Sequence, residues 1–533
     1  MMVRKRQPCP ARDQRAHGNV DAWILGSSIA SLASAVHLIR DASVPASQVH
    51  ILESRRAPDD GVPTTGDPMS GYDHRAACLP IVCDNCTKDL LSLVPSAPGS
   101  EKTVLDNINE AKRNTAPIRI FIQNGHGLEA IEPTKFNIGW KVRINLIMFM
   151  LKSEKRLGRQ TIGDSFNKGF FASRFWAVWS STFGFCPWHS AVEFRRCLKR
   201  FFHDFQYRTD FTALDRCRYN THEDIILPIT RFLQEQGVDL QFDSIVTDIT
   251  MDLKGGRQTI SAFKLVQNGL ENIVAVGSHD IVIASLGSSI SGSTRGTNTI
   301  PPSLELLKAE DNLDENWSLW LTLGSSLGDP YSFCTRVSES RVETFTVTLK
   351  GAEYFNHFTK LTQAENGSTT SISLRDSNWL ISLFIPHQPL FPQQSTDVQV
   401  IWGYGSLPQH VGNFVKKPML NCSGQEIMIE LLQHLSVPSE PILGHSITIP
   451  RVMPRLAAPL LPRAYEDRPE VIPENTTNFA VVGQFVEIPD ETSTTMAYSV
   501  HGAQIAVYRL MDLQKEPKKA KKRSIVLYLG FKI

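Results

Sequence analysis

The 533-residue sequence lacks an excess of charge of either sign. Lys and Arg total 55 against 54 Asp and Glu, which gives a formal net charge of +1. The large basic excess of a nucleic-acid-binding surface is therefore absent, and so is the acidic excess of many disordered chains. Hydrophobic residues make up 41% and charged residues 20%, as in globular proteins. We expect a globular protein of about two to four domains without a nucleic-acid partner.

Long apolar runs and paired cysteines are also missing. Runs such as Ala22–Leu25 and Ile281–Leu286 have the size of strands and fall far short of the roughly 18 residues that a spanning helix needs. No apolar segment typical of a signal peptide follows the basic residues 1–18. The nine cysteines are odd in number and diffusely spaced. Cys83 and Cys86 form a lone C-x-x-C with no second pair nearby to complete a zinc site, and the histidines have no zinc-like spacing. These absences predict a cytoplasmic protein without disulfides or a metal.

The first structured residues have the pattern of a β-α-β unit. An apolar run ends at Gly26, a stretch rich in small residues and leucine follows, and a second apolar run ends at Glu53. Dinucleotide-binding domains begin in this way, with a Gly-x-Gly-x-x-Gly turn and an acidic residue that binds a ribose. Here the three glycine positions hold Gly26, Ser28 and Ser31, so only the turn glycine is present. The altered motif leaves nucleotide binding and a serine-rich turn both open.

A second glycine turn lies near the other end of the chain. Residues 478–482 are predicted to form a strand, Gly483 a turn, and the residues up to about 510 a helix. Flavoproteins that begin with a β-α-β unit commonly return with such a turn, and the start of the following helix then faces the cofactor. The two motifs predict an α/β fold. It contains a discontinuous, doubly wound, Rossmann-like FAD-binding domain with inserted helical and mixed α+β substrate domains.

The predicted organisation has five parts, which alternate between the nucleotide domain and its insertions. They are a disordered basic tail at 1–18; the FAD-binding domain at 19–83, 206–300 and 474–512; a mostly helical substrate-channel region at 84–205; a mixed α+β substrate domain at 301–473; and a basic and apolar tail at 513–533.

Several long segments resemble the oleate hydratase family, also called myosin-cross-reactive antigens. The resemblance extends from about residue 22 to about residue 510. Its most distinctive parts are Trp188–Arg196, Asp376–Leu380, Asn413–Met419, Leu461–Ala464 and Asn478–Pro489. It implies a flavoprotein that adds water to the cis double bond of an unsaturated fatty acid, without net redox chemistry. A homodimer is a further expectation from the family.

The resemblance also implies which residues hold FAD and the substrate. The implied cofactor contacts are Gly26, Ser28, Ser31, Glu53, Arg75, Val246, Gly483, Gln484, Phe485 and Glu487. In the family a glutamate and a tyrosine handle the water and the alkene proton. The alignment places Leu79 at the glutamate and Ala177 or Val178 at the tyrosine. None of these three side chains can transfer a proton.

The segment that holds the fatty-acid carboxylate in the family has also changed. Phe384, Pro386 and Leu390 stand at the threonine, asparagine and histidine positions, and His387 lies between them. Three interpretations follow. The chain is a divergent hydratase that uses Asp73, Asp84 or His387; a repurposed flavoenzyme for a less polar lipid; or a non-catalytic lipid- or flavin-binding protein. Solvated loop carboxylates and a structural histidine would equally account for these residues.

Two basic regions suggest anionic partners. Residues 513–533 contain seven basic residues against Glu516, together with an apolar patch. This composition indicates peripheral membrane contact, a run similar to a nuclear-localisation signal, or a helix cap that docks on the body of the protein. A basic helix face is formed by Arg195, Arg196, Lys199 and Arg200, and it is either solvated or directed at a substrate carboxylate or a membrane headgroup.

Overall fold

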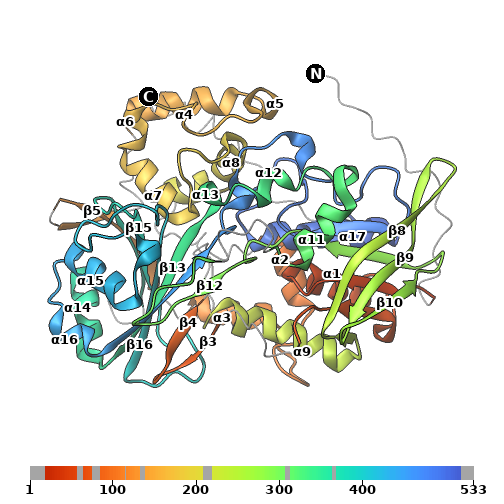
Figure 1. Cartoon of the computed structure of the whole chain (residues 1–533), viewed down its shortest axis with the longest axis horizontal. Coiled ribbons are helices and arrows are strands. Elements are labelled where there is room, and N and C mark those ends of the chain that lie inside the picture. Colours follow the sequence, from red (N-terminus) through yellow and green to blue (C-terminus); the bar gives the residue numbers. More distant parts are fainter. Residues whose placement is uncertain are drawn as a thin grey trace.

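The computed structural model describes residues 19–56, 64–74, 84–113, 116–125, 127–131, 139–207, 219–305, 313–362 and 368–517. The predicted tail at 1–18, most of the tail at 513–533, and the two site positions Arg75 and Leu79 lie outside these ranges. Within them, two sheets stand side by side below a layer of helices (Figure 1). No helix in the described ranges is long and apolar enough to cross a membrane.

One sheet consists of five parallel strands in the order β18-β11-β1-β2-β7. The strands are β1 (Ala22–Leu25), β2 (Val49–Leu52), β7 (Asp239–Gln241), β11 (Ile281–Ser285) and β18 (Phe479–Val482). Helices α1 (Ile29–Arg40) and α17 (Met496–Leu510) pack on it, and α9 (Leu227–Gln236) packs against α1. Every residue of β11 and β18 is buried, as expected for parallel strands covered on both faces. The predicted α/β, Rossmann-like fold class is confirmed.

A small antiparallel sheet lies beside these strands. It contains β8 (Ser244–Lys254), β9 (Arg257–Gln267) and β10 (Leu270–Ala275). Helix α11 (Glu315–Leu323) packs against β8. The chain therefore returns to the half that contains the parallel sheet after residue 313, inside the segment 301–473 that was predicted to belong to the substrate domain.

The second large sheet has eight strands in the order β12-β17-β13-β16-β15-β14-β5-β6. They are β5 (Ala116–Asn124), β6 (Gly127–Ile131), β12 (Thr294–Arg295), β13 (Val342–Lys350), β14 (Ser368–Leu374), β15 (Ile381–Ile385), β16 (Val398–Gly405) and β17 (Ser446–Met453). Helices α14 (Ala352–Thr362), α15 (Gly424–His434) and α16 (Glu440–Leu443) pack on it. A hairpin of β3 (Thr64–Asp67) and β4 (Gly71–His74) contacts β13, where Tyr72 N donates to Thr348 Oγ1 at 2.8 Å.

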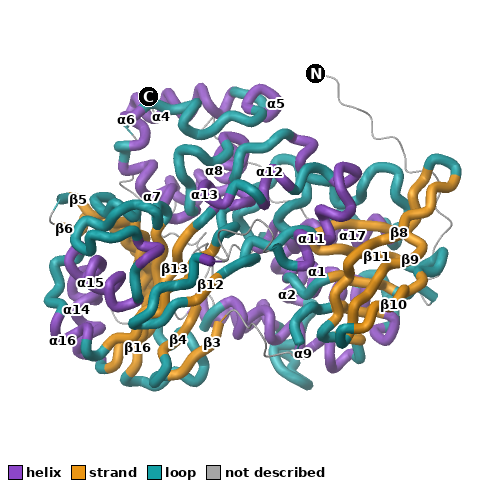
Figure 2. The backbone as a smooth tube through the Cα atoms, in the orientation of Figure 1, coloured by secondary structure: helices purple, strands orange, loops and turns teal. Residues whose placement is uncertain are grey.

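The remaining helices connect the two sheets, and several form the upper layer of Figure 2. They are α2 (Asn85–Ser92), α3 (Val104–Arg113), α4 (Trp140–Leu151), α5 (Glu154–Leu157), α6 (Lys168–Phe171), α7 (Arg174–Phe183), α8 (Ala191–Tyr207), α12 (Tyr331–Cys334) and α13 (Val337–Ser340). An aromatic core joins α4, α6, α7 and α8. In it Phe166 stacks on Phe170 with ring centroids 3.9 Å apart, and Phe175 stacks on Trp179 at 5.1 Å.

Three short stretches differ from the sequence-based prediction. Residues 64–74, expected as loop, form the β3–β4 hairpin, because Gly66 and Gly71 adopt positive φ angles around a tight turn. Strands β5 and β6 interrupt the region 84–205 that was predicted to be mostly helical. Strand β12, inside the predicted nucleotide segment 206–300, pairs with β17 of the eight-stranded sheet.

Candidate functional site

The candidate site lies at the carboxyl end of the parallel strands around β1, the region that is called the crevice below. Strand β1 lies between β2 and β11, so the strand order reverses on its two sides. In doubly wound sheets, ligands bind outside the carboxyl ends of the strands at such a reversal. The residues that follow β1, β2, β11 and β18 meet there, and the start of α1 points into the same region.

Gly26 makes the turn from β1 into α1. Its φ is +91°, and its amide donates to Leu52 O at 2.8 Å. A Cβ at this position would lie 3.2 Å from Asn316 Oδ1 and 3.4 Å from the Ser285 Cβ. Both the backbone conformation and the available space therefore require glycine.

Three serine hydroxyls gather at the start of α1. Ser28 is the N-cap and accepts from Ser31 N at 3.3 Å. Its Oγ also lies 3.2 Å from Ser31 Oγ, and Ser285 Oγ donates to it at 3.1 Å. The two serines that replace fingerprint glycines thus cap the helix and present hydroxyl groups at its positive end.

Glu53 and Arg55 form the opposite side of the crevice. Glu53 is only 6% exposed and accepts from Arg55 N at 3.0 Å. The Arg55 guanidinium contacts Glu53 Oε2 at 3.4 Å and donates to Ser27 Oγ at 3.3 Å, so it bridges the end of β2 and the first turn. Ser244 N donates to Glu53 O at 3.0 Å, which brings the strand that carries Val246 towards the same edge.

These groups fit a dinucleotide. A helix N-terminus, serine hydroxyls and a guanidinium suit a diphosphate, and a carboxylate at the end of the second strand suits a ribose. Gly483, at the end of β18, has φ +110°, and a Cβ there would lie 3.5 Å from Ser285 Oγ. The first and last glycine turns therefore flank the same serine, Ser285.

The side chains after Gly483 are engaged within the protein. Gln484 Nε2 donates to Ser493 O at 3.3 Å. Phe485 is buried against Trp317, with ring centroids 4.7 Å apart, and against Phe333 at 5.5 Å. Any contact between these two residues and a cofactor would therefore use their backbone.

Glu487 belongs to a buried ionic network. Its carboxylate lies 2.7 Å from Arg196 Nη2 and 2.5 Å from Arg463 Nη2. Glu193 joins the same network through Arg463 at 3.3 Å and Arg468 at 3.1 Å. Burial alone would raise the pKa of Glu193, but Arg468, Arg196 and Arg463 outweigh it and lower the pKa to about 2. Arg196, which the sequence placed on a solvated or substrate-facing helix face, is 1% exposed and structural.

A second polar cluster lies between the starts of α2 and α17. His501 Nδ1 is 3.0 Å from Glu491 Oε2, and its Nε2 has no hydrogen-bond partner among the described residues. Asp84 caps α2 by accepting from Thr87 N at 3.0 Å, and its carboxyl is influenced by the charges of Glu491 and His501. Burial raises the pKa of Asp84 above its ordinary value. The sequence analysis named Asp84 but neither Glu491 nor His501, because the members of the cluster come from opposite ends of the chain.

Asp73 differs from the solvated loop residue that the sequence left open. It lies on β4, is 5% exposed, and forms ion pairs with Arg451 and with Arg295, the latter at 3.4 Å. Its neighbour His74 is fully buried, and this burial lowers its pKa to about 4. The carboxylate of Asp73 is therefore held by two guanidinium groups. Asp84 is likewise a helix cap and not a solvated loop carboxylate.

The positions aligned with the family's substrate residues are mainly apolar. Phe384 stacks on Trp402 with centroids 4.1 Å apart, and Leu390 is 5% exposed. Pro386 accepts from Gln388 Nε2 at 3.0 Å, and His387 N donates to Thr369 Oγ1 at 3.3 Å. Nothing in this geometry resembles a carboxylate clamp at Phe384, Pro386 or Leu390.

The tyrosine-equivalent positions lie on α7. Ala177 is 5% exposed and Val178 is fully buried, and both belong to the aromatic core. They contribute packing at this place and no polar group.

The fold and its crevice define an α/β protein of the Rossmann-like class. The chain belongs to the MCRA family, which matches residues 19–508. It is 31% identical over 509 residues to an oleate hydratase from Streptococcus pyogenes serotype M49 (strain NZ131), with 92% of this chain and 85% of that protein covered. It is 29% identical over 535 residues to a linoleate hydratase from Lactiplantibacillus plantarum, with coverages of 91% and 93%. The family predicted from the sequence is confirmed.

Proposed function

We propose that this protein is an oleate-hydratase-like flavoprotein that adds water to a cis double bond of an unsaturated fatty acid or a related lipid. The observation that carries the proposal is the convergence of Gly26, Ser28, Glu53 and Arg55 at the strand-order reversal, in a chain of this family. The two hydratase relatives supply the reaction class.

FAD would be held by its dinucleotide half. The diphosphate would lie at the start of α1, between the serine hydroxyls and Arg55, and Glu53 would accept hydrogen bonds from a ribose. When bound, FAD would supply a planar charged ring system that shapes the site without net redox chemistry. Glu487 is already paired with Arg196 and Arg463, so its side chain would stabilise the fold beside the site and would not contact FAD.

The proton transfers would fall to the cluster of His501, Glu491 and Asp84. Glu491 would accept from Nδ1, which leaves Nε2 as the ring nitrogen that can take a proton from water. Asp84, whose pKa is raised by burial, would donate a proton to one alkene carbon while the hydroxyl adds to the other. Transfer of the proton from His501 to Asp84 restores both groups. Glu491 is a positioning residue in this scheme.

A second candidate substrate is a lipid without a free carboxylate. The stack of Phe384 on Trp402 favours it, because a buried carboxylate beside these rings would lose its water without gaining a partner. A fatty-acid ester would not incur that penalty.

The test begins with the purified full chain and FAD. We expect a stoichiometric flavin absorbance spectrum and, after incubation with oleate, linoleate or methyl oleate, products heavier by one water in mass spectrometry. Arg55→Gln should weaken FAD binding at least tenfold, whereas Arg257→Gln, at an exposed position on β9, should not. Absence of FAD binding would refute the flavoprotein assignment. Binding without product from any of the three lipids would refute the hydratase assignment and leave a repurposed flavoenzyme or a non-catalytic protein.

A further inference from the structure

Helix α4 carries an exposed apolar ridge. Trp140, Ile144, Met148 and Leu151 are 68%, 50%, 60% and 62% exposed. Their spacing places all four on one side of the helix. Figure 1 shows α4 along the upper edge of the molecule, away from both sheets. A contiguous set of large apolar side chains on an outer helix marks an interaction surface more often than scattered ones do.

The opposite side of α4 is firmly packed. Leu146, Phe149 and Met150 are buried, and the Phe149 ring lies 4.9 Å from Phe166 and 5.8 Å from Phe194. The inner side therefore fixes the orientation of the helix, and the ridge is a constant feature of the surface. An apolar helix face that the fold holds outward is available to a partner outside the chain.

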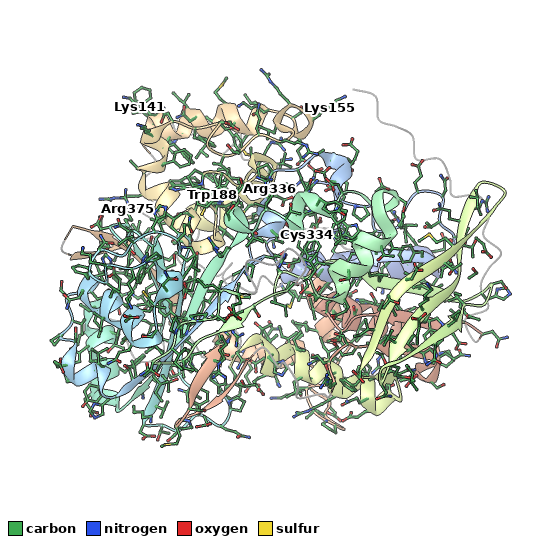
Figure 3. The ribbon with its side chains drawn as sticks, in the orientation of Figure 1. Lys141, Lys155, Trp188, Cys334, Arg336 and Arg375 are labelled. Atoms are coloured by element: carbon green, nitrogen blue, oxygen red, sulfur yellow. The ribbon has the colours of Figure 1, made fainter. Side chains whose placement is uncertain are left out.

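Basic residues border the ridge. Between residues 139 and 160 the chain has six Lys and Arg, and Glu154 is the one acidic residue, which gives a net charge of 6 − 1 = +5. Glu154 itself is bonded to Arg196 at 2.8 Å. Lys141 and Lys155 stand near the two ends of α4 and α5, at the outer edge of the molecule (Figure 3). Lys141 Nζ lies 5.6 Å above the Trp140 ring.

We propose that the α4 ridge docks the protein on an anionic lipid surface. Apolar side chains on one side of a helix enter the boundary between headgroups and acyl chains, and lysines beside them approach lipid phosphates. A tryptophan suits this boundary. A symmetric contact with a second copy would bring two +5 segments together, so the charge favours a lipid partner over a copy of the chain. The ridge is distinct from the tail at 513–533, and this inference does not depend on the hydratase reaction.

The experiment is co-sedimentation of the full chain with vesicles. We expect binding to vesicles of equal parts phosphatidylglycerol and phosphatidylcholine, and at least tenfold weaker binding to phosphatidylcholine alone. The double variant Met148→Ser/Leu151→Ser should reduce binding to the anionic vesicles at least tenfold. The matched control is Leu270→Ser/Ile273→Ser, which removes apolar side chains that are 70% and 73% exposed on β10 and should bind like the unaltered chain. Circular dichroism checks that both variants are folded.

Three outcomes would overturn the proposal. One is equal binding by the α4 variant and the β10 control. Another is loss of all vesicle binding when the chain is truncated after Leu513, with no effect of the α4 variant, which would assign the contact to the tail. The third is a dimer, measured by light scattering, that the α4 variant converts to a monomer, which would assign the ridge to a second copy.

Discussion

His501 Nδ1 lies 3.0 Å from Glu491 Oε2, and the pair stands near the start of α17, the helix that packs on β18 and α1. The carboxylate fixes the orientation of the ring through Nδ1, and Nε2 has no hydrogen-bond partner among the described residues. An arrangement of this kind orients a general base.

The first prediction concerns this pair. His501→Asn should lower lipid hydration at least 100-fold, because removal of a general base typically costs two to four orders of magnitude. The dissociation constant for FAD should stay within about twofold. Glu491→Gln should cost less and should shift the pH profile of the rate, since the orienting charge is lost. His279→Asn, at an exposed position, is the control. Unchanged turnover in His501→Asn would remove the cluster from the mechanism.

The second prediction separates backbone strain from crowding at the first turn. Gly26 and Gly237 have similar φ angles, +91° and +87°, but only Gly26 has neighbours near its would-be Cβ. Substitution by alanine should destabilise the fold by about 1 kcal/mol at each position through the positive φ. Only Gly26→Ala should also weaken FAD binding, measured by calorimetry, because the new methyl group presses on Asn316 and Ser285. Equal FAD affinities of the two variants would contradict the assigned crevice.

The third prediction contrasts two fully buried glutamates. Glu193 faces three arginines and is ionised, whereas neither oxygen of Glu343 has a hydrogen-bond partner among the described residues. Burial raises the pKa of Glu343 well above its ordinary value, and the charge of Arg341 only partly opposes this rise. Glu193→Gln should cost about 3–5 kcal/mol in urea unfolding, because it leaves buried guanidinium charges uncompensated. Glu343→Gln should cost less than about 1 kcal/mol, because the exchange breaks no hydrogen bond of the side chain to a described residue.

The free energy of unfolding should also depend on pH through Glu193. The folded pKa of Glu193 is lowered from 4.5 to about 2, so its contribution is present above pH 4.5 and is lost as the pH falls towards 2. The loss amounts to about 3 kcal/mol. Unfolding midpoints measured between pH 6 and pH 3 should fall for the unaltered chain and fall less for Glu193→Gln. Parallel curves would contradict the assignment.

The fourth prediction concerns Asp314, which caps α11 beside the crevice. Burial raises its pKa from 3.8 to about 6, with a further contribution from Glu315. The group therefore favours folding fully below pH 3.8, and this advantage is lost as the pH rises through 6. Asn caps helices as well as Asp. Asp314→Asn should raise stability by about 2–3 kcal/mol at pH 8 and leave it unchanged at pH 4. Thermal unfolding at the two pH values provides the measurement, and a gain of equal size at both would refute the raised pKa.

The elements of the parallel sheet could be predicted from the sequence, because their signals are local. An apolar run, a glycine and a following run of small residues identify β1, Gly26 and α1. Glu53 and Gly483 follow strands in the same recognisable way. The prediction that the region 84–205 is mostly helical was wrong at strand β5. The alternation of Ile118, Ile120 and Ile122 has the period of a strand, but the surrounding helices led us to expect a helix.

The polar clusters could not be predicted, because they depend on contacts between distant segments. Arg196 has the spacing of a surface helix residue, and only the approach of Glu487 shows that it is buried. Asp84 and His501 meet because α2 packs on α17. The periodicity of apolar residues predicts which side of a helix is buried. It does not predict an ion pair between residues that are several hundred positions apart in the sequence.

The strand order of the parallel sheet has a consequence for how the protein is made. Strand β1 leaves the ribosome early, but β18 and α17, which complete its sheet and cover α1, come from residues 479–510. At about 5–20 residues per second, the first strands wait roughly half a minute to a minute and a half for these partners. The nascent chain therefore exposes apolar surface for most of its synthesis. We expect its yield in cells to depend on chaperones that bind it during translation.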